Sequence, residues 1–171
     1  MLIEEVVERP PLLIMVHPGS ACGSLNDAFG KSAGGAYRDG LVIDLNNSKG
    51  GVLIVDGEFS DEIPYYGDFN SAILNALQRA KTAGLPSVRI DADDNSPRWV
   101  AKTLNTVRQM GYVATDTIVV SGIWVGTDEG WGANSGCVTA VFKSLKRAGY
   151  TTVSISEWAI PDVDEYARDE D

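Results

Sequence analysis

Residues 69–91, FNSAILNALQRAKTAGLPSVRID, contain a helical pattern followed by a short strand. The apolar residues of the first part recur at the spacing of one helix face. They are Phe69, Ile73, Ala76, Leu77 and Ala80. Gly84 ends the helix, because glycine readily takes the left-handed conformation that closes a last helical turn. SVRID, residues 87–91, predicts a strand, and the apolar run VLIVD precedes the helix at residues 52–56. This order predicts a strand–helix–strand unit.

The same alternation of apolar runs and helical patterns continues on both sides of this unit. Further strands are predicted at residues 12–16 (LLIMV), 41–45 (LVIDL), 117–125 (TIVVSGIWV) and 152–156 (TVSIS). The strand at 41–45 is expected to form a hairpin with 52–56 or to lie beside it. Helices are predicted from Ser96 to about Met110 and within residues 134–150. We therefore predict a three-layer, Rossmann-like α/β domain whose mainly parallel sheet has about six strands.

The length of 171 residues suits a single domain with a sizeable core. We expect one α/β domain over residues 1–161, in which residues 1–50 form an N-terminal extension with an extra strand. Residues 162–171, DVDEYARDED, are expected to be a solvated acidic tail that supplies half of the formal net charge of −10. The sequence has no basic stripe that could bind a phosphate backbone, so we predict that nucleic acid is not a partner.

The chain contains no apolar run as long as the ~18 residues of a membrane-spanning helix, so we predict no membrane partner. Its acidic N-terminus lacks a basic region followed by an apolar one, which predicts a cytoplasmic protein without a signal peptide. Cys22, Cys137 and the one histidine do not have the spacing of a zinc site, and we predict neither a metal nor another cofactor. The acidic run DADD, residues 91–94, has two interpretations, a Mg²⁺ or Ca²⁺ site or a solvated loop before a helix.

The stretch NSGCVTAVFKSLKRAGY, residues 134–150, puts Cys137 on the first turn of an amphipathic helix. Unpaired N–H groups and the helix dipole at such a position stabilise a thiolate, the nucleophilic form of cysteine. Gly136 allows the backbone to approach a substrate oxygen, and N–H groups there would form an oxyanion hole. On a helical wheel Cys137 flanks the apolar face. The alternative interpretation is therefore a half-buried small apolar residue.

Asp56 and His17 each stand at the end of a predicted strand, where parallel sheets carry their ligand sites. Asp56 fits a general base or an orienting carboxylate, and its alternative is an aspartate that begins the turn DGEFSD. Glu58 in the same turn would raise the pKa of a neighbouring carboxyl. His17, the single histidine, is a candidate general base for Cys137, and its alternative is a structural role.

Four segments in this order resemble the isochorismatase-like cysteine hydrolases. They are GGVLIVDGEFSD, SAILNALQRAKTAGLPSVRID, TIVVSGIWV and SGCVTAVFKSLKRAGYTTVSIS. The family has an apolar strand ending in D-x-Q, a helix leading to a G-L-P-V strand, and a later loop that enters S-G-C-V. The resemblance covers residues 51–156, and its strongest part is S-G-C-V with the Gly149-Tyr150 pair that follows. It implies the isochorismatase-like form of the α/β fold.

The resemblance also implies an Asp-Lys-Cys site in which the cysteine attacks an amide, imidate or similar carbon. Cys137 matches the nucleophile and Asp56 the aspartate. The sequence departs from the family in four places. Glu58 replaces the glutamine, residues 127–134 are added before the cysteine, the lysine segment is shortened, and the N-terminal 50 residues have no counterpart. Lys102, the one lysine in that segment, lies opposite the buried side of its helix on a helical wheel, so we predict that it is solvated.

Trp124 and Trp131 flank the added loop. The two tryptophans are candidates for an aromatic wall beside the cysteine. Together with Glu58 and Gly136 they are the predicted substrate-binding residues. Two alternatives remain open, namely packing inside the domain and the subunit interface of a homo-oligomer.

These observations predict a cysteine-dependent hydrolase that acts on a small C–N (amide-like) or related bond of a small-molecule substrate. Cys137 is the predicted nucleophile and Asp56 the acid/base, with His17 or an unidentified cation in place of the lysine. The alternative is a non-catalytic protein of the same fold that serves ligand binding or assembly, because a missing lysine can mark lost chemistry.

Overall fold

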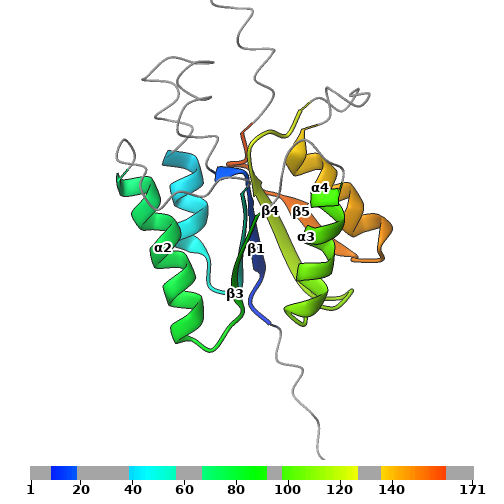
Figure 1. Cartoon of the computed structure of the whole chain (residues 1–171), viewed down its shortest axis with the longest axis horizontal. Helices are drawn as coiled ribbons and strands as arrows, with labels where there is room; N and C mark the ends of the chain where they lie inside the picture. Colours follow the sequence, from blue (N-terminus) through cyan, green and yellow to red (C-terminus); the bar gives the residue numbers. More distant parts are fainter. Residues whose placement is uncertain (1–8, 19–38, 57–66, 92–97, 127–135, 161–171) are drawn as a thin grey trace, which may run out of the picture.

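The computed structural model describes residues 9–18, 39–56, 67–91, 98–126 and 136–160 of the chain, which form an α/β fold (Figure 1). The strands in these ranges are β1 (Leu12–Val16), β2 (Val52–Asp56), β3 (Ser87–Asp91), β4 (Thr117–Gly122) and β5 (Thr152–Ile155). The labelled helices are α2 (Gly67–Thr82), α3 (Arg98–Gln109) and α4 (Cys137–Arg147). Residues 39–47 are also helical and are called helix 39–47.

The five strands form one parallel sheet in the order β3-β2-β1-β4-β5. β1 is its central strand, with Val16 paired to Val55 of β2 on one side and to Gly122 of β4 on the other. The sequence predicts β1 as part of an N-terminal extension, but this position makes it integral to the sheet. The three-layer α/β prediction is confirmed, with five strands in the described residues rather than about six.

Residues 41–45, predicted as a strand, belong to helix 39–47 instead. Leu41 and Leu45 are completely buried, whereas Ile43 between them is 38% exposed. In a strand all three side chains would share one face, so burial of the first and fifth residues with exposure of the third is the helical pattern. A run of five residues is too short for its period to separate the two structures, which is why this prediction is wrong.

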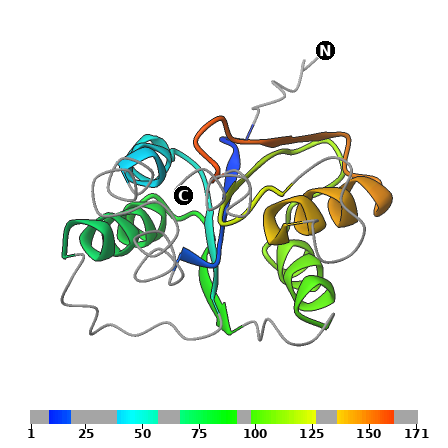
Figure 2. The same ribbon diagram turned by 90° about the horizontal axis from the view of Figure 1, so that it is seen from above.

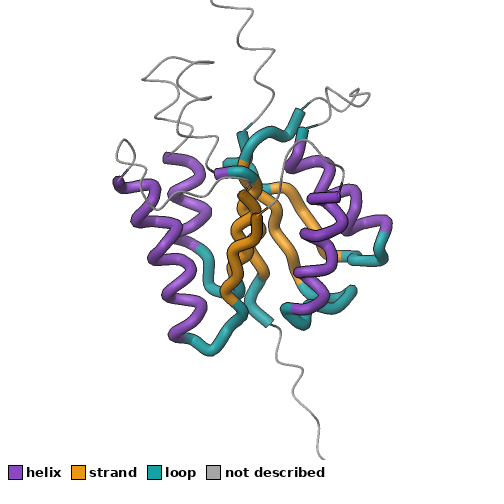
Figure 3. The backbone as a smooth tube through the Cα atoms, in the orientation of Figure 1, coloured by secondary structure: helices purple, strands orange, loops and turns teal. Residues whose placement is uncertain are grey.

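Helices cover both faces of the sheet. α2 and helix 39–47 lie on one face, and α3 and α4 lie on the other (Figures 1, 2 and 3). The α2-face cluster of buried residues includes Leu13, Met15, Leu41, Leu45, Ile73 and Ile123. The α4-face cluster includes Leu12, Ile14, Val16, Trp99, Val138, Val141 and Leu145. Odd and even positions of β1 thus pack in different clusters, because successive side chains of a strand point to opposite faces.

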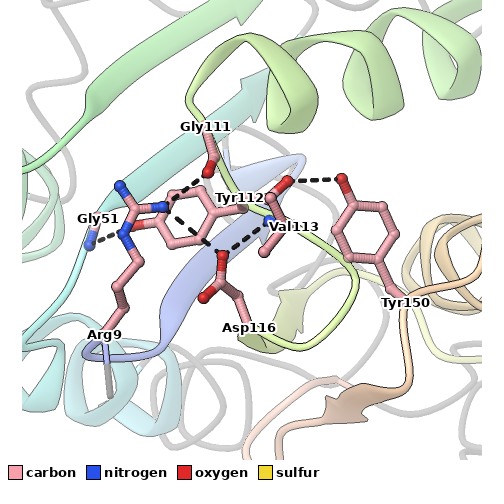
Figure 4. A network of polar contacts seen from close by, with 7 residues as sticks. All are labelled: Arg9, Gly51, Gly111, Tyr112, Val113, Asp116 and Tyr150. Atoms are coloured by element: carbon pink, nitrogen blue, oxygen red, sulfur yellow. Dashed lines mark hydrogen bonds and ion pairs between the residues drawn. The ribbon is translucent and has the colours of Figure 1, made fainter. Parts of the chain in front are cut away.

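Two tyrosines join distant segments at the amino edge of the sheet, where the strands begin (Figure 4). The hydroxyl of Tyr112 accepts a hydrogen bond from the Gly51 N–H, just before β2, at 3.0 Å. The hydroxyl of Tyr150, before β5, donates to the Tyr112 carbonyl oxygen at 2.9 Å. Burial raises the pKa of the Tyr112 phenol above its ordinary value of 10.0. The neutral phenol of Tyr112 therefore links the segments that lead into β2 and β4, and the Tyr150 hydroxyl joins the segment before β5 to them.

Arg9, which precedes β1, adds charged contacts to the same edge (Figure 4). Its guanidinium lies 4.8 Å from the centroid of the Tyr112 ring and donates to the Gly111 carbonyl oxygen at 2.8 Å. It also forms an ion pair of 3.6 Å with Asp116, whose carboxylate accepts a hydrogen bond from the Val113 N–H. Because the Arg9 side chain is 42% exposed, we expect the ion pair to contribute little to stability.

Candidate active site

The predicted residues His17 and Asp56 stand at the ends of neighbouring strands, at the carboxyl edge of the sheet. Asp56 is the last residue of β2, and His17 follows the neighbouring strand β1 directly. The His17 N–H donates to the Val55 carbonyl oxygen at 2.7 Å, so the backbones of the two strand ends lie side by side. On the other side of β1, the Ile123 N–H donates to the Val16 carbonyl oxygen at 3.0 Å. The end of β4 therefore adjoins the same place.

His17 has a backbone conformation that is uncommon for a residue with a side chain. Its φ angle is 51°, in the left-handed region, and only 3% of the residue is exposed. The imidazole packs on Trp99 of α3, with 4.8 Å between the ring centroids and 51° between the ring planes. Residues held in this region cost of the order of 1 kcal/mol and are found where a site requires them. The ring of His17 thus points to the face of the sheet that α3 and α4 cover.

Cys137 is the first residue of α4, as the sequence predicts, and it carries a thiol. It is partly exposed and packs against the α4-face cluster. Trp99, the partner of the His17 ring, belongs to that same cluster. α4 follows β4, which is the neighbour of β1 in the sheet. His17 and Cys137 therefore flank one cluster on one face of the sheet.

The start of α4 is docked on the backbone that follows β4. The Gly136 N–H donates to the Val125 carbonyl oxygen at 3.2 Å, and the Val138 N–H donates to the Trp124 carbonyl oxygen at 3.1 Å. The Thr139 hydroxyl also donates to the Val125 carbonyl oxygen. These bonds satisfy N–H groups that a helix start leaves without partners inside the helix.

This docking gives Gly136 a structural role. A Cβ atom at this position would lie 1.8 Å from the Trp124 carbonyl oxygen, so the glycine serves the close approach of two backbone segments. Its N–H is already bonded to Val125 and does not act as an oxyanion donor. A substrate oxygen is therefore not what requires glycine here.

The structure favours packing as the role of Trp124. Its indole is partly buried against the α2-face cluster, on the opposite face of the sheet from the cluster that Cys137 flanks. The aromatic wall predicted beside the cysteine gains no support from this placement. Glu58, Trp131 and Cys22 lie outside the described residues, as do the side chain of Asp56 and most of the DADD run.

Lys102 is exposed, as the helical wheel predicts, but its side chain turns back to the sheet. Its Nζ atom donates to the carbonyl oxygen of Asp91, the last residue of β3, at 2.7 Å. Asp91 is the register partner of Asp56. A lysine ammonium group therefore lies at the carboxyl edge, one strand away from the backbone of Asp56.

A second polar cluster, which the sequence analysis missed, lies on the α2 face. Asp44 of helix 39–47 accepts hydrogen bonds from the hydroxyls of Ser121 in β4, at 2.5 Å, and of Ser156 after β5, at 2.7 Å. Burial raises the pKa of the Asp44 carboxyl above its ordinary value of 3.8, and the two hydroxyls oppose that change. The partners are 77 and 112 residues from Asp44 in sequence, and no local motif signals such a contact.

In the described part of the chain, no group of three or more histidine, cysteine or acidic side chains is arranged to hold a metal ion. None of the helices in these ranges combines the length and the apolar character that a membrane crossing requires. Comparisons with models of protein families, with curated proteins and with solved structures find no match to this chain.

Proposed function

We propose that the protein is a cysteine-dependent hydrolase of a small C–N (amide-like) or related bond, with Cys137 as its nucleophile. The observation that supports it most is that the His17 ring, at the carboxyl edge of the sheet, packs on Trp99 of the hydrophobic cluster that Cys137 also contacts. Ligand sites of parallel α/β folds lie at this edge. The left-handed backbone of His17 adds support, because such conformations gather at functional sites.

In the proposed reaction the chain supplies the nucleophile and the proton carriers. His17 or Asp56 accepts the thiol proton, and the Cys137 thiolate attacks the carbonyl carbon to form a C–S bond. The C–N bond then breaks, and the protonated base gives its proton to the leaving nitrogen. Water, deprotonated by the same base, cleaves the thioester and restores the thiol. No oxidant or other co-reactant is required.

The proposed reaction also needs a cation and a group that stabilises the oxyanion. Lys102 holds an ammonium group at the same edge, and it is a candidate for the cation that the family resemblance implies. Oxyanion stabilisation has to come from groups other than the N–H groups of Gly136 and Val138, because both are bonded to carbonyl oxygens. The anion-binding capacity of the α4 start is reduced accordingly.

That same docking favours a second candidate, a non-catalytic protein of this fold that binds a ligand. The carbonyl oxygens of Trp124 and Val125 take up N–H groups on both sides of Cys137. They bring partial negative charge to the start of α4, where a thiolate would need positive charge. In this case Cys137 is a packing residue of the α4-face cluster.

Alkylation of Cys137 by iodoacetamide as a function of pH tests the proposal. Mass spectrometry of the digested protein reports Cys137 separately from Cys22, and Cys137→Ser confirms the assignment of the peptide. For a nucleophile, we expect half-maximal labelling of Cys137 well below the ordinary cysteine value of ~8.5. A midpoint at or above that value, or no labelling of the folded protein, would support the non-catalytic candidate instead.

His17→Asn is the matched variant for the general base. Asparagine tolerates the left-handed conformation and keeps a polar side chain, but it is not a base at neutral pH. If the imidazole activates the thiol, labelling of Cys137 at pH 7 should slow by about tenfold, which corresponds to one pKa unit. The labelling rate of Cys22 is the internal control. Equal Cys137 rates in both proteins would remove His17 from the mechanism.

A further inference from the structure

A cavity on the α2 face lies apart from the cysteine site. Its volume is 270 Å³, and it is lined by residues at the start of β1, by Val119 of β4, and by helix 39–47 with the residues that follow it. Leu13 and Val119 provide apolar surface, and Asp44 provides a carboxylate. Asn47 and Lys49 line it beyond Asp44 along the chain. The cavity thus combines an apolar surface with one carboxylate, from Asp44, and one ammonium group, from Lys49.

The cavity is built on a helix end that is held firmly. Arg79 of α2 donates to the Leu45 carbonyl oxygen at 2.6 Å and to the Ser48 carbonyl oxygen at 3.2 Å. These bonds satisfy carbonyl groups that a helix end leaves open. The Asp44 side chain is fixed from the other direction by the hydroxyls of Ser121 and Ser156. The carboxylate is therefore preorganised.

The charge of Asp44 has no partner of opposite sign among the residues that the structure describes. The salt bridge among these residues joins Arg9 and Asp116, at the amino edge of the sheet. Glu157 is a further negative charge close to Asp44. Burying a carboxylate without a cation is unfavourable, and a cationic ligand would remove that cost.

We propose that this cavity binds a small primary ammonium compound with an apolar body. The ammonium group donates to the Asp44 carboxylate, and the apolar body packs on Leu13 and Val119. The hydroxyls of Ser121 and Ser156 hold the Asp44 carboxylate in place from outside the cavity lining, and a carboxylate can accept a further hydrogen bond from an ammonium group. Lys49 in the lining disfavours a second positive charge, so the ligand class is monoamines rather than diamines.

The cavity volume of 270 Å³ limits the ligand to a small molecule. n-Pentylammonium fits within this limit and carries no group besides the ammonium and its chain. n-Pentanol has the same chain without the charge, and it is the matched control ligand.

Titration of the isotope-labelled protein by ¹⁵N–¹H NMR tests the proposal, because this measurement detects weak binding and locates it. n-Pentylammonium should give saturable shifts at the amides of Leu13, Asn47 and Val119. Asp44→Asn keeps an acceptor for the serines but removes the charge, and it should weaken binding by about tenfold or more. Glu157→Gln removes a nearby charge outside the cavity lining and should change the affinity by less than about threefold.

Val119→Phe provides a second variant that does not depend on the Asp44 network. The larger side chain fills the cavity, so binding should be lost while the spectrum remains that of a folded protein. Equal shifts with n-pentanol, unchanged affinity in Asp44→Asn, or shifts that do not map to the cavity would each overturn the proposal. These outcomes are independent of the labelling of Cys137, so the two proposals can fail separately.

Discussion

At the amino edge of the sheet three side chains join distant segments, whereas at the carboxyl edge two backbone hydrogen bonds dock the start of α4. At the amino edge the Tyr112 hydroxyl, the Tyr150 hydroxyl and the Arg9 guanidinium join segments before four strands. At the carboxyl edge α4 docks through the N–H groups of Gly136 and Val138. Stability at one edge therefore depends on the identity of a few side chains, and at the other on room for the backbone.

The side chains that hold the amino edge are therefore different residues from the candidate catalytic residues at the carboxyl edge. The hydrogen bonds that dock α4 come from the Gly136 and Val138 N–H groups and the Thr139 hydroxyl, not from the Cys137 side chain. Cys137→Ser should therefore fold normally, which makes it a sound control for the labelling experiment. Chemistry placed at the amino edge would have to share its residues with the contacts that hold the sheet. The predictions that follow test this division.

The largest effect is expected from Gly136→Ala at the carboxyl edge. The new Cβ would lie 1.8 Å from the Trp124 carbonyl oxygen and close to backbone atoms of Val125, which cannot move without undocking α4. We expect a loss of about 3 kcal/mol in the free energy of unfolding. Urea denaturation measures it, with comparison of midpoints at constant slope.

Gly84→Ala is the matched control for this prediction. Gly84 has a φ angle of 74° but no atom within 4 Å of a new Cβ, so alanine there meets only the cost of the left-handed conformation. That cost is about 1 kcal/mol. Equal losses in the two variants would mean that the close approach at Gly136 is not present in solution.

A smaller effect is expected from Tyr112→Phe at the amino edge. The phenylalanine keeps the ring but leaves the buried Gly51 N–H without its acceptor, which costs about 2 kcal/mol. Tyr150→Phe leaves only a carbonyl oxygen without one donor, and a carbonyl tolerates this better than an N–H group does. Denaturation with urea should therefore show a larger loss for Tyr112→Phe than for Tyr150→Phe, and the reverse order would contradict the described network.

The smallest effect is the alkaline pH dependence of the same edge. The folded-state pKa of Tyr112 is raised above 10.0, so the fold favours the neutral phenol. Its contribution to stability is fully present below the unfolded-state pKa and is lost as the pH rises through the higher folded-state pKa. The difference in unfolding free energy between the wild type and Tyr112→Phe should shrink as the pH rises above the ordinary tyrosine pKa of 10.0. A constant difference would show that the phenol titrates alike in both states.

Most elements of the fold follow from periodicity in the sequence. The strand runs at 12–16, 52–56 and 87–91 match β1, β2 and β3, because buried parallel strands are continuous apolar runs. The position of β1 at the sheet centre could not be predicted in the same way, since strand order depends on contacts between distant segments. The run at 41–45 failed because five residues do not define a period.

The candidate site was predictable in its location but not in its details. The ends of β1 and β2 had to meet once the strands were parallel neighbours, which brings His17 and Asp56 to one edge. The role of Gly136 was not predictable, because a glycine before a helix suits a substrate oxygen and a neighbouring backbone equally. The helical wheel correctly predicts that Lys102 is exposed. A wheel does not take side-chain length into account, however, and the long lysine side chain brings its ammonium group back to the Asp91 carbonyl oxygen.

The docking of α4 has a consequence for how this protein can change. Val125 and Gly136 are bonded to each other, so the chain between them begins and ends at two fixed points. A replacement of that intervening segment, whether by evolution or by a protein engineer, can keep both points and leave the sulfur of Cys137 where it is. The start of α4 is thus held by the residues on either side of that segment.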